Sequence, residues 1–186
     1  MKKPAFTLIE VIVVITIISL LVGLVILNFR EGMWRQDLSL TGNQTYAMLQ
    51  QARADVASGK KLENEDEGTF NFLCEGAYFE VGQKPMMANT LYDLEKGVCL
   101  MEALESEDYG SIPNSVITDS IVVGESTVKE LWVLFEPPAA DIAFYSSIGE
   151  RLSNDAVLEL MHSRNETLRL NVSLGAENNQ ISVTLP

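Results

Sequence analysis

The hydrophobic pattern changes sharply along this chain, and its first part is almost purely apolar. Residues 11–27 are 17 consecutive residues without a charge, and Phe6 and Phe29 extend the apolar segment on either side. As a helix, residues 6–29 would be about 36 Å long, enough to cross the roughly 30 Å of hydrocarbon in a bilayer. Because the segment is apolar on every side, we expect it to contact lipid or other helices all round.

Three other interpretations of this segment explain less. A buried core helix needs a large apolar shell, whereas most of the remaining chain has the pattern of half-buried strands. A cleaved secretory signal needs small residues after the apolar run, but Asn28, Phe29 and Arg30 stand there. An ordinary single-span anchor is compatible with the length, yet it leaves the acid Glu10 unexplained.

Glu10 is an ionisable residue near the start of the apolar segment. A carboxylate there costs at least about 2 kcal/mol unless a partner neutralises it. No Lys or Arg lies between Phe6 and Phe29. A chain cut just before Phe6 would carry a new α-amine one helical turn from Glu10. The amine of a neighbouring copy, shifted along the helix axis, could then pair with this carboxylate.

The next segment, residues 38–58, predicts an amphipathic helix. Gly32 and Gly42 precede or interrupt it, and each weakens a helix by about 1 kcal/mol relative to alanine. Residues 28–43 are therefore expected to bend or melt on assembly. Apolar and small residues recur at spacings of three and four and define one helix face: Leu38, Thr41, Thr45, Met48, Leu49, Ala52 and Val56.

Beyond residue 61 the pattern changes to short runs rich in β-branched and aromatic residues, which predict strands. We expect an antiparallel meander packed on the helix, which is an α+β fold. An acidic loop is predicted at 62–68, a turn at 136–141, and either helix or strand at 154–162. The expected strands are 69–73, 77–81, 98–102, 116–123, 130–135, 142–146, 167–174 and 180–185.

Charge and composition exclude several classes of function. The 186 residues carry 13 Lys and Arg against 26 Asp and Glu, a net charge of −13. This acidity argues against a nucleic-acid partner, because phosphate contacts need clustered cations. A single histidine, His162, rules out a site built on several histidines. The length allows one domain with an appendage, not a large multidomain enzyme.

Candidate chemistry in the remaining chain is thin, and we expect no catalytic residue, no metal site and no cofactor. His162 is expected at the surface or at a hinge, Trp34 at an interface and Trp132 in the core. Two acidic groups could offer oxygen ligands to a divalent cation, but solvated loops explain them better: Glu63, Glu65, Asp66 and Glu67, and Glu105, Glu107 and Asp108.

Cys74 and Cys99 are the two cysteines, 25 residues apart. In an oxidising exterior they could form a disulfide, worth about 3 kcal/mol for a loop of this length. Two reduced, buried thiols are the alternative.

The N-terminus resembles the signature of type IV pilins and type II secretion pseudopilins. The sequence Lys2-Lys3-Pro4-Ala5, then Phe6-Thr7-Leu8-Ile9-Glu10, then the unbroken apolar run, carries this resemblance. It implies that a prepilin peptidase cleaves between Ala5 and Phe6, that Phe6 is N-methylated, and that Glu10 guides docking into a filament. One position departs from the family, because Ala5 stands where glycine is usual.

The resemblance also implies an organisation and a role for the whole chain. Residues 1–5 would be the leader, 6–29 the transmembrane and filament-core helix, 30–59 its amphipathic continuation, and 60–186 a globular β domain. The later strands also resemble, weakly, the H-type minor pseudopilins. The sequence leaves open whether the subunit is major or minor, and whether its filament serves a pilus or secretion.

The partners implied are other pilin or pseudopilin subunits, the prepilin peptidase, an inner-membrane assembly platform and the bilayer. Lys2 and Lys3 predict a cytoplasmic N-terminus by the positive-inside rule. The expected location is the inner membrane first, and afterwards a periplasmic or extracellular filament. The alternative is a single-pass, membrane-anchored enzyme or binding domain unrelated to filaments.

Overall fold

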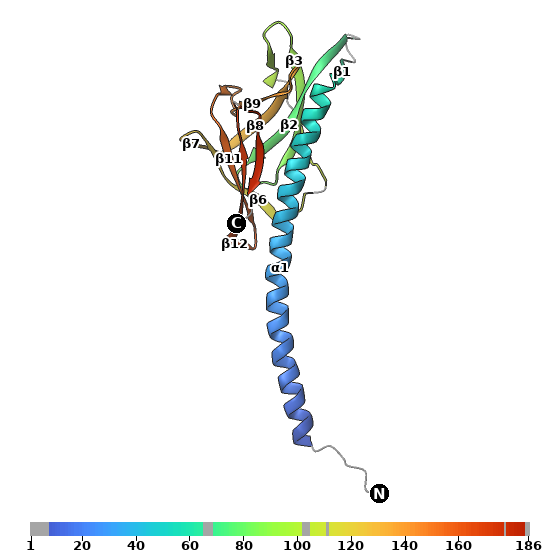
Figure 1. Cartoon of the computed structure of the whole chain (residues 1–186), viewed down its shortest axis with the longest axis vertical. Coiled ribbons are helices and arrows are strands. Elements are labelled where there is room, and N and C mark those ends of the chain that lie inside the picture. Colours follow the sequence, from blue (N-terminus) through green and yellow to red (C-terminus); the bar gives the residue numbers. More distant parts are fainter. Residues whose placement is uncertain (1–7, 65–68, 102–104, 111, 177, 185–186) are drawn as a thin grey trace. The chain divides into compact units, whose positions relative to one another are not determined.

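The computed structural model describes residues 8–64, 69–101, 105–110, 112–176 and 178–184. They form two compact units, Met1–Gln36 and Asp37–Pro186. The helix α1, Leu8–Ala57, supplies all the described structure of the first unit and continues into the second. The chain therefore has the predicted α+β class, with one long N-terminal helix and antiparallel sheets (Figure 1).

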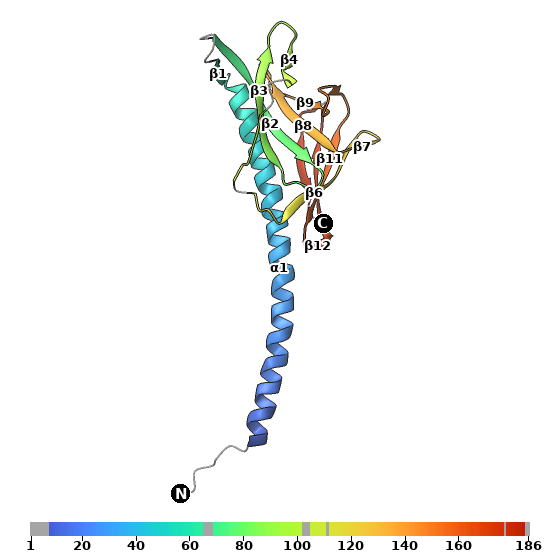
Figure 2. The ribbon, with the colours of Figure 1, turned by 180° about the vertical axis from the view of Figure 1, so that it is seen from behind.

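The second unit contains an eight-stranded sheet with the order β10-β9-β8-β2-β3-β4. Strand β1 also pairs with β2, and β5 pairs with β3. Figure 2 shows β2, β3 and β8 in this sheet from behind. Its strands are β1 (Lys61–Asn64), β2 (Thr69–Glu80), β3 (Met86–Asp93), β4 (Val98–Cys99), β5 (Glu105–Glu107), β8 (Glu130–Glu136), β9 (Asp141–Tyr145) and β10 (Arg151–Leu152).

A five-stranded sheet with the order β13-β12-β11-β6-β7 completes this unit. A single parallel bridge, between Val81 and Thr118, connects the two sheets among the described residues. The strands of the second sheet are β6 (Val116–Val123), β7 (Ser126–Val128), β11 (Ala156–His162), β12 (Asn165–Leu174) and β13 (Ile181–Thr184).

The predicted apolar face of the second helical segment is confirmed. All seven of its residues are at most 1% exposed, so this face of α1 is buried within the second unit. Gly42 lies between these residues and permits the close approach. A Cβ at this position would come 2.7 Å from Leu170 Cδ1 and 3.0 Å from Val183 Cγ1. Helix α1 continues through residues 28–43 without a break.

The strand predictions are right for β6 and nearly right for β8, β9, β12 and β13. The prediction of two strands at 69–73 and 77–81 is wrong, because β2 runs continuously from Thr69 to Glu80. Gly76 lies inside β2, where it gives close contact with β8 rather than a turn. The prediction at 98–102 is too long, since β4 ends at Cys99.

Other corrections concern segments that form strands although their own sequences do not predict it. Residues 62–64 of the predicted acidic loop belong instead to β1, because this strand pairs with β2. The segment 154–162, left open as helix or strand, contains β11. Strand β3 was not predicted, because residues 86–89 include Ala and Asn, which are depleted in strands. Pairing with β2, β4 and β5 holds the segment extended.

Candidate functional site

The apolar part of α1 in the first unit exposes its side chains on every side. Its large aliphatic residues from Leu8 to Ile26 have exposed fractions between 46% and 81%. Among the described residues, α1 is the helix long and apolar enough to span a membrane, and none of its most apolar window is buried. This surface must be covered by lipid or by other proteins in any stable state.

The two hydroxyl groups in the described part of the apolar segment are hydrogen-bonded inside the helix. Thr16 Oγ1 donates to the carbonyl oxygen of Ile12, and Ser19 Oγ donates to that of Ile15, each at 2.8 Å. Beyond its first turn, α-helical geometry pairs the backbone N–H and C=O groups of this stretch within α1. A segment whose polar groups are satisfied internally can enter hydrocarbon without the cost of unpaired donors.

Glu10 lies on this apolar surface, in the first turn of α1. Ile9, Val13 and Val14 line the same shallow surface hollow as Glu10. A carboxylate in the first helical turn interacts favourably with the positive end of the helix dipole. Toward the C-terminus, the next charged residue in the sequence is Arg30, about 30 Å away along a helix. The other predicted processing residues, Ala5 and Phe6, lie outside the described residues.

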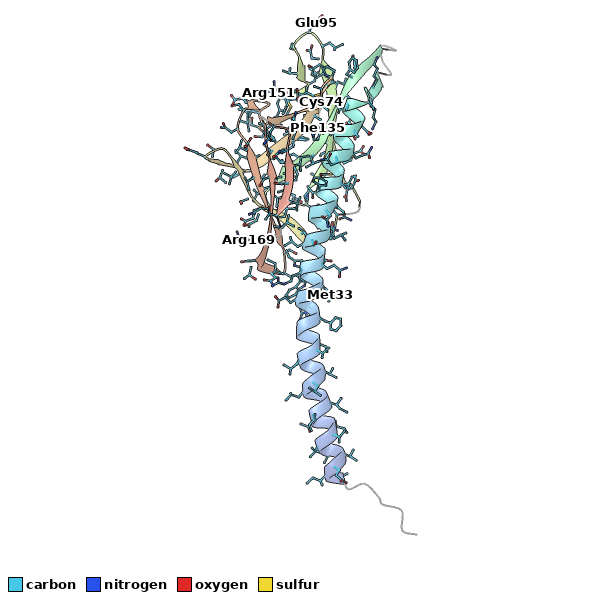
Figure 3. The ribbon with its side chains drawn as sticks, viewed as in Figure 1. Met33, Cys74, Glu95, Phe135, Arg151 and Arg169 are labelled. Carbon is cyan, nitrogen blue, oxygen red and sulfur yellow. A yellow bond between two sulfur atoms is a disulfide. The ribbon has the colours of Figure 1, made fainter. Side chains whose placement is uncertain are left out.

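Cys74 and Cys99 are joined by a disulfide that connects β2 to the short strand β4. Both residues are buried, at 0% and 3% exposure. They belong to a core cluster that also contains Tyr78, Leu134 and Tyr145. Figure 3 places Cys74 and Phe135 within the second unit. The bond closes a long loop around β3, so its effect is structural.

A buried polar cluster beside this disulfide was not predicted. Tyr145 Oη accepts a hydrogen bond from the Cys99 backbone N–H at 3.4 Å and donates one to Glu136 Oε1. Arg151 donates to Glu136 Oε2 at 2.8 Å. Burial, followed by the adjacent Glu136 carboxylate, raises the pKa of Tyr145. The cluster connects β4 with β8, β9 and β10, and every interaction in it is internal to the fold.

A second cluster of charged residues connects the C-terminal end of α1 with β2 through two salt bridges. Lys60 Nζ lies 2.6 Å from Asp55 Oδ2 and 3.3 Å from Glu75 Oε2. Glu75 is only 2% exposed, and burial raises its pKa although Lys60 opposes this effect. The hydrogen bond from Lys60 lowers the pKa of Asp55.

His162 is buried at 1% exposure, so its predicted surface or hinge position is wrong. It ends β11, whose alternate residues face the core. Its Nε2 atom lies 3.7 Å from Asp37 Oδ2, and its Nδ1 accepts a hydrogen bond from the Arg164 backbone N–H. Ser115 Oγ also donates to Asp37, at 3.2 Å. These contacts indicate that His162 has a structural role in the core of the second unit.

The remaining candidates lie as follows. Trp132 is half-buried and packs on Tyr78, with 4.2 Å between ring centroids. Glu105 and Glu107 lie in the exposed strand β5, and Asp108 accepts a hydrogen bond from Lys84. No group of three or more potential metal ligands occurs among the described residues. Glu65, Asp66 and Glu67 are outside them.

The comparisons with known proteins bear on the N-terminus. A family model described as the prokaryotic N-terminal methylation motif matches residues 1–26. No curated protein and no solved structure matches the chain. The match covers Ala5, Phe6, Glu10 and most of the exposed apolar segment. Residues 1–26 of this chain therefore carry the prepilin signature of type IV pilins and pseudopilins.

Proposed function

We propose that this chain is a structural subunit, a pilin or pseudopilin, of a type IV pilus or type II secretion filament. The observation that carries the proposal is the exposed apolar segment of α1 with one acid, Glu10, in its first turn. A bilayer covers such a helix before assembly, and the helices of other subunits cover it afterwards. The matching prepilin signature supports this role.

The proposed mechanism begins with processing. A prepilin peptidase removes residues 1–5 by cleaving between Ala5 and Phe6, and the new amine of Phe6 is methylated. Glu10 then pairs with the terminal amine of an adjacent subunit as the helix leaves the membrane. This pairing offsets the cost, at least about 2 kcal/mol, of a carboxylate in an apolar environment. Apolar burial and helix packing supply the remaining stabilisation.

In the proposed organisation, each segment of the chain has its own role. Residues 6–29 span the membrane and later form the filament core, 30–59 continue the helix, and 60–186 coat the outside. The subunit starts in the inner membrane with its N-terminus in the cytoplasm, where the peptidase and the assembly platform act on it. The filament is then periplasmic or extracellular.

The charge of the second unit favours a minor subunit. Residues 37–186 carry nine Lys and Arg against 24 Asp and Glu, a net charge of −15. Identical units of this charge repel one another when packed side by side. Less acidic neighbours remove this repulsion, so we infer that the chain is inserted sparsely among other subunits. Counting this subunit per unit length of purified filament tests the inference, and a filament made of this chain alone would contradict it.

A membrane-anchored enzyme or binding domain is the alternative. The most buried ionisable groups of the described chain include Glu75, Glu136 and His162. Each is held by partners from the fold itself. This pattern favours a structural role over catalysis. Ligand-induced stabilisation of the protein in a small-molecule screen would support the alternative.

The decisive experiment compares two acids on the same helix. Glu10→Ala should abolish incorporation into filaments while the protein still inserts into the membrane. Glu31→Ala is the matched control, because Glu31 is exposed and already paired with Arg35 at 2.9 Å. We expect Glu31→Ala to be incorporated normally. Incorporation of Glu10→Ala at the wild-type level would overturn the proposed mechanism.

A further inference from the structure

The turn that follows the apolar segment combines a cation with an aromatic ring. The guanidinium carbon of Arg30 lies 5.4 Å from the centroid of the Trp34 ring, within the range of a cation–π interaction. Arg30 is exposed and Trp34 is half-buried. Figure 3 labels Met33, which lies in the same turn. Arg30 therefore directs its charge along the helix, away from the apolar segment and toward Trp34.

The second arginine of this segment has a different partner. Arg35 donates two hydrogen bonds to Glu31 Oε1, at 2.9 and 3.3 Å. Its charge is balanced within the helix by the carboxylate. Arg30 instead lies on a neutral ring, which leaves its positive charge available to an anion. The charge of Arg35 is thus neutralised by Glu31, whereas the Trp34 ring does not neutralise the charge of Arg30.

The positions of Arg30 and Trp34 along the helix correspond to the headgroup layer of a bilayer. The helix from Leu8 to Phe29 is about 33 Å long, close to the roughly 30 Å of hydrocarbon. Arg30 then lies about 1.5 Å beyond the hydrocarbon boundary and Trp34 about 7.5 Å beyond it. The headgroup layer on each side is about 5–8 Å thick. Both residues fall at this layer.

The chemistry of the pair matches the lipid groups found there. A guanidinium offers a planar set of N–H donors that binds phosphate. Tryptophan prefers the interface between hydrocarbon and water, with its ring in the apolar part and its N–H near polar groups. A long cationic side chain that leaves the hydrocarbon in this way keeps its charge hydrated.

We propose that Arg30 and Trp34 form an interfacial anchor that binds phosphates of the leaflet at the C-terminal end of the apolar segment. The pair fixes the depth of α1 in the membrane before assembly. This inference rests on the proposed membrane-spanning state of the subunit. Removal of Lys2 and Lys3 with the leader would leave the α-amine as the cation at the other end.

Depth-resolved fluorescence quenching of the full chain tests the proposal. The protein is reconstituted into vesicles of phosphatidylcholine and phosphatidylglycerol that carry a nitroxide either at the headgroup or deep in the acyl chain. The protein contains two tryptophans, Trp34 and Trp132. The difference between the wild type and Trp34→Phe isolates the signal of Trp34. We expect the headgroup nitroxide to quench this signal more strongly than the deep one.

Two arginine variants show whether the pair itself sets the depth. Arg30→Gln should move the quenching maximum of Trp34 toward the deep nitroxide. Arg35→Gln removes the same charge but leaves the Arg30–Trp34 contact, so it should leave the maximum in place. An equal shift in both variants would show that net charge alone sets the depth, which overturns the proposal. Stronger quenching of the wild type by the deep nitroxide, or no quenching of Trp34, would also overturn it.

The result is independent of filament formation, because the vesicles contain no assembly machinery. A wild-type protein with interfacial Trp34, together with normal incorporation of Glu10→Ala, would refute the filament mechanism and leave the anchor standing. Failure of the quenching test, together with loss of incorporation in Glu10→Ala, would refute the anchor alone.

Discussion

Gly76 of β2 lies directly against the backbone of Val133 in β8. A Cβ atom on Gly76 would fall 1.8 Å from the carbonyl oxygen of Val133 and 2.8 Å from its carbonyl carbon. No side chain fits in this space, because backbone atoms cannot rotate away as a flexible side chain can. The central contact of the eight-stranded sheet therefore depends on a residue without a side chain.

Gly76→Ala should lower the free energy of unfolding by about 3 kcal/mol or more, because β2 and β8 must separate to admit the methyl group. Urea unfolding of the detergent-solubilised protein, followed by near-ultraviolet circular dichroism, measures the change. Gly32→Ala is the control, since a Cβ there meets nothing within 4 Å. Equal stabilities of the two variants would contradict the importance of this contact.

The Cys74–Cys99 disulfide should contribute about 3 kcal/mol, because it closes a loop of 25 residues in the unfolded chain. The double variant Cys74→Ser, Cys99→Ser should lose this amount in the same unfolding assay. A thiol count on the native protein, with and without denaturant and without reductant, should find no free thiol. Two reactive thiols appearing in denaturant would show that the bond is absent.

Tyr145→Phe should destabilise the second unit by about 1–3 kcal/mol. The change removes the hydroxyl that joins the Cys99 N–H to the buried carboxylate of Glu136. Tyr46→Phe provides a matched control, because Tyr46 is 41% exposed and its hydroxyl group can be hydrated. If thermal unfolding midpoints of the two variants agree, the Tyr145 cluster contributes no stability.

The pH dependence of stability should differ in sign between Glu75 and Asp55. Burial raises the pKa of Glu75 from 4.5, so its favourable contribution is fully present below pH 4.5 and is lost as the pH rises through the folded-state pKa. Glu75→Gln should therefore gain stability relative to the wild type as the pH increases from below 4.5 to neutrality. Urea midpoints measured across this range give the difference.

The contribution of Asp55 to stability should depend on pH with the opposite sign. Its hydrogen bond from Lys60 lowers its pKa below 3.8, so its contribution is present above pH 3.8 and is lost as the pH falls through the folded-state pKa. Asp55→Asn should therefore be less stable than the wild type at neutral pH and approach it in acid. A pH-independent difference for both variants would rule out these pKa shifts as the cause.

The mature protein should begin at Phe6 and carry a methyl group on its amine. Mass spectrometry of the N-terminal peptide from assembled material checks both features. Retention of Met1 or Lys2 in that material would contradict cleavage between Ala5 and Phe6. Ala5→Gly introduces the residue that is usual before the cut in proteins with this signature, and it should be processed at least as fast as the wild type.

Local patterns accounted for the helix and for the strongest strands. The buried face from Leu38 to Val56 could be predicted because a helix repeats every 3.6 residues, so spacing alone shows which residues share a side. Strands β6 and β12 could be predicted from their β-branched and alternating apolar residues. In contrast, the first half of β3 contains Ala and Asn, which are depleted in strands, and pairing with β2, β4 and β5 holds the segment extended.

The residues of the candidate site also differ in whether the sequence alone identifies them. Glu10 and the apolar segment were recognisable because an acid within an apolar run is a property of neighbouring residues. The burial of His162 and the cluster of Tyr145, Glu136 and Arg151 were not recognisable. These residues meet through contacts between strands, and the periodicity of one strand does not specify which other strand lies beside it.

The sequence by itself determined that a long apolar helix opens the chain, where its acid lies, and which face of residues 38–58 is buried. Each of these depends on residues within a few turns of one another. Only the tertiary structure decided the order of the strands, the unbroken course of β2 through Gly76, and the partners of the buried charges. Those features depend on free energies shared between segments far apart in the chain, such as Gly76 and Val133, and no local pattern records them.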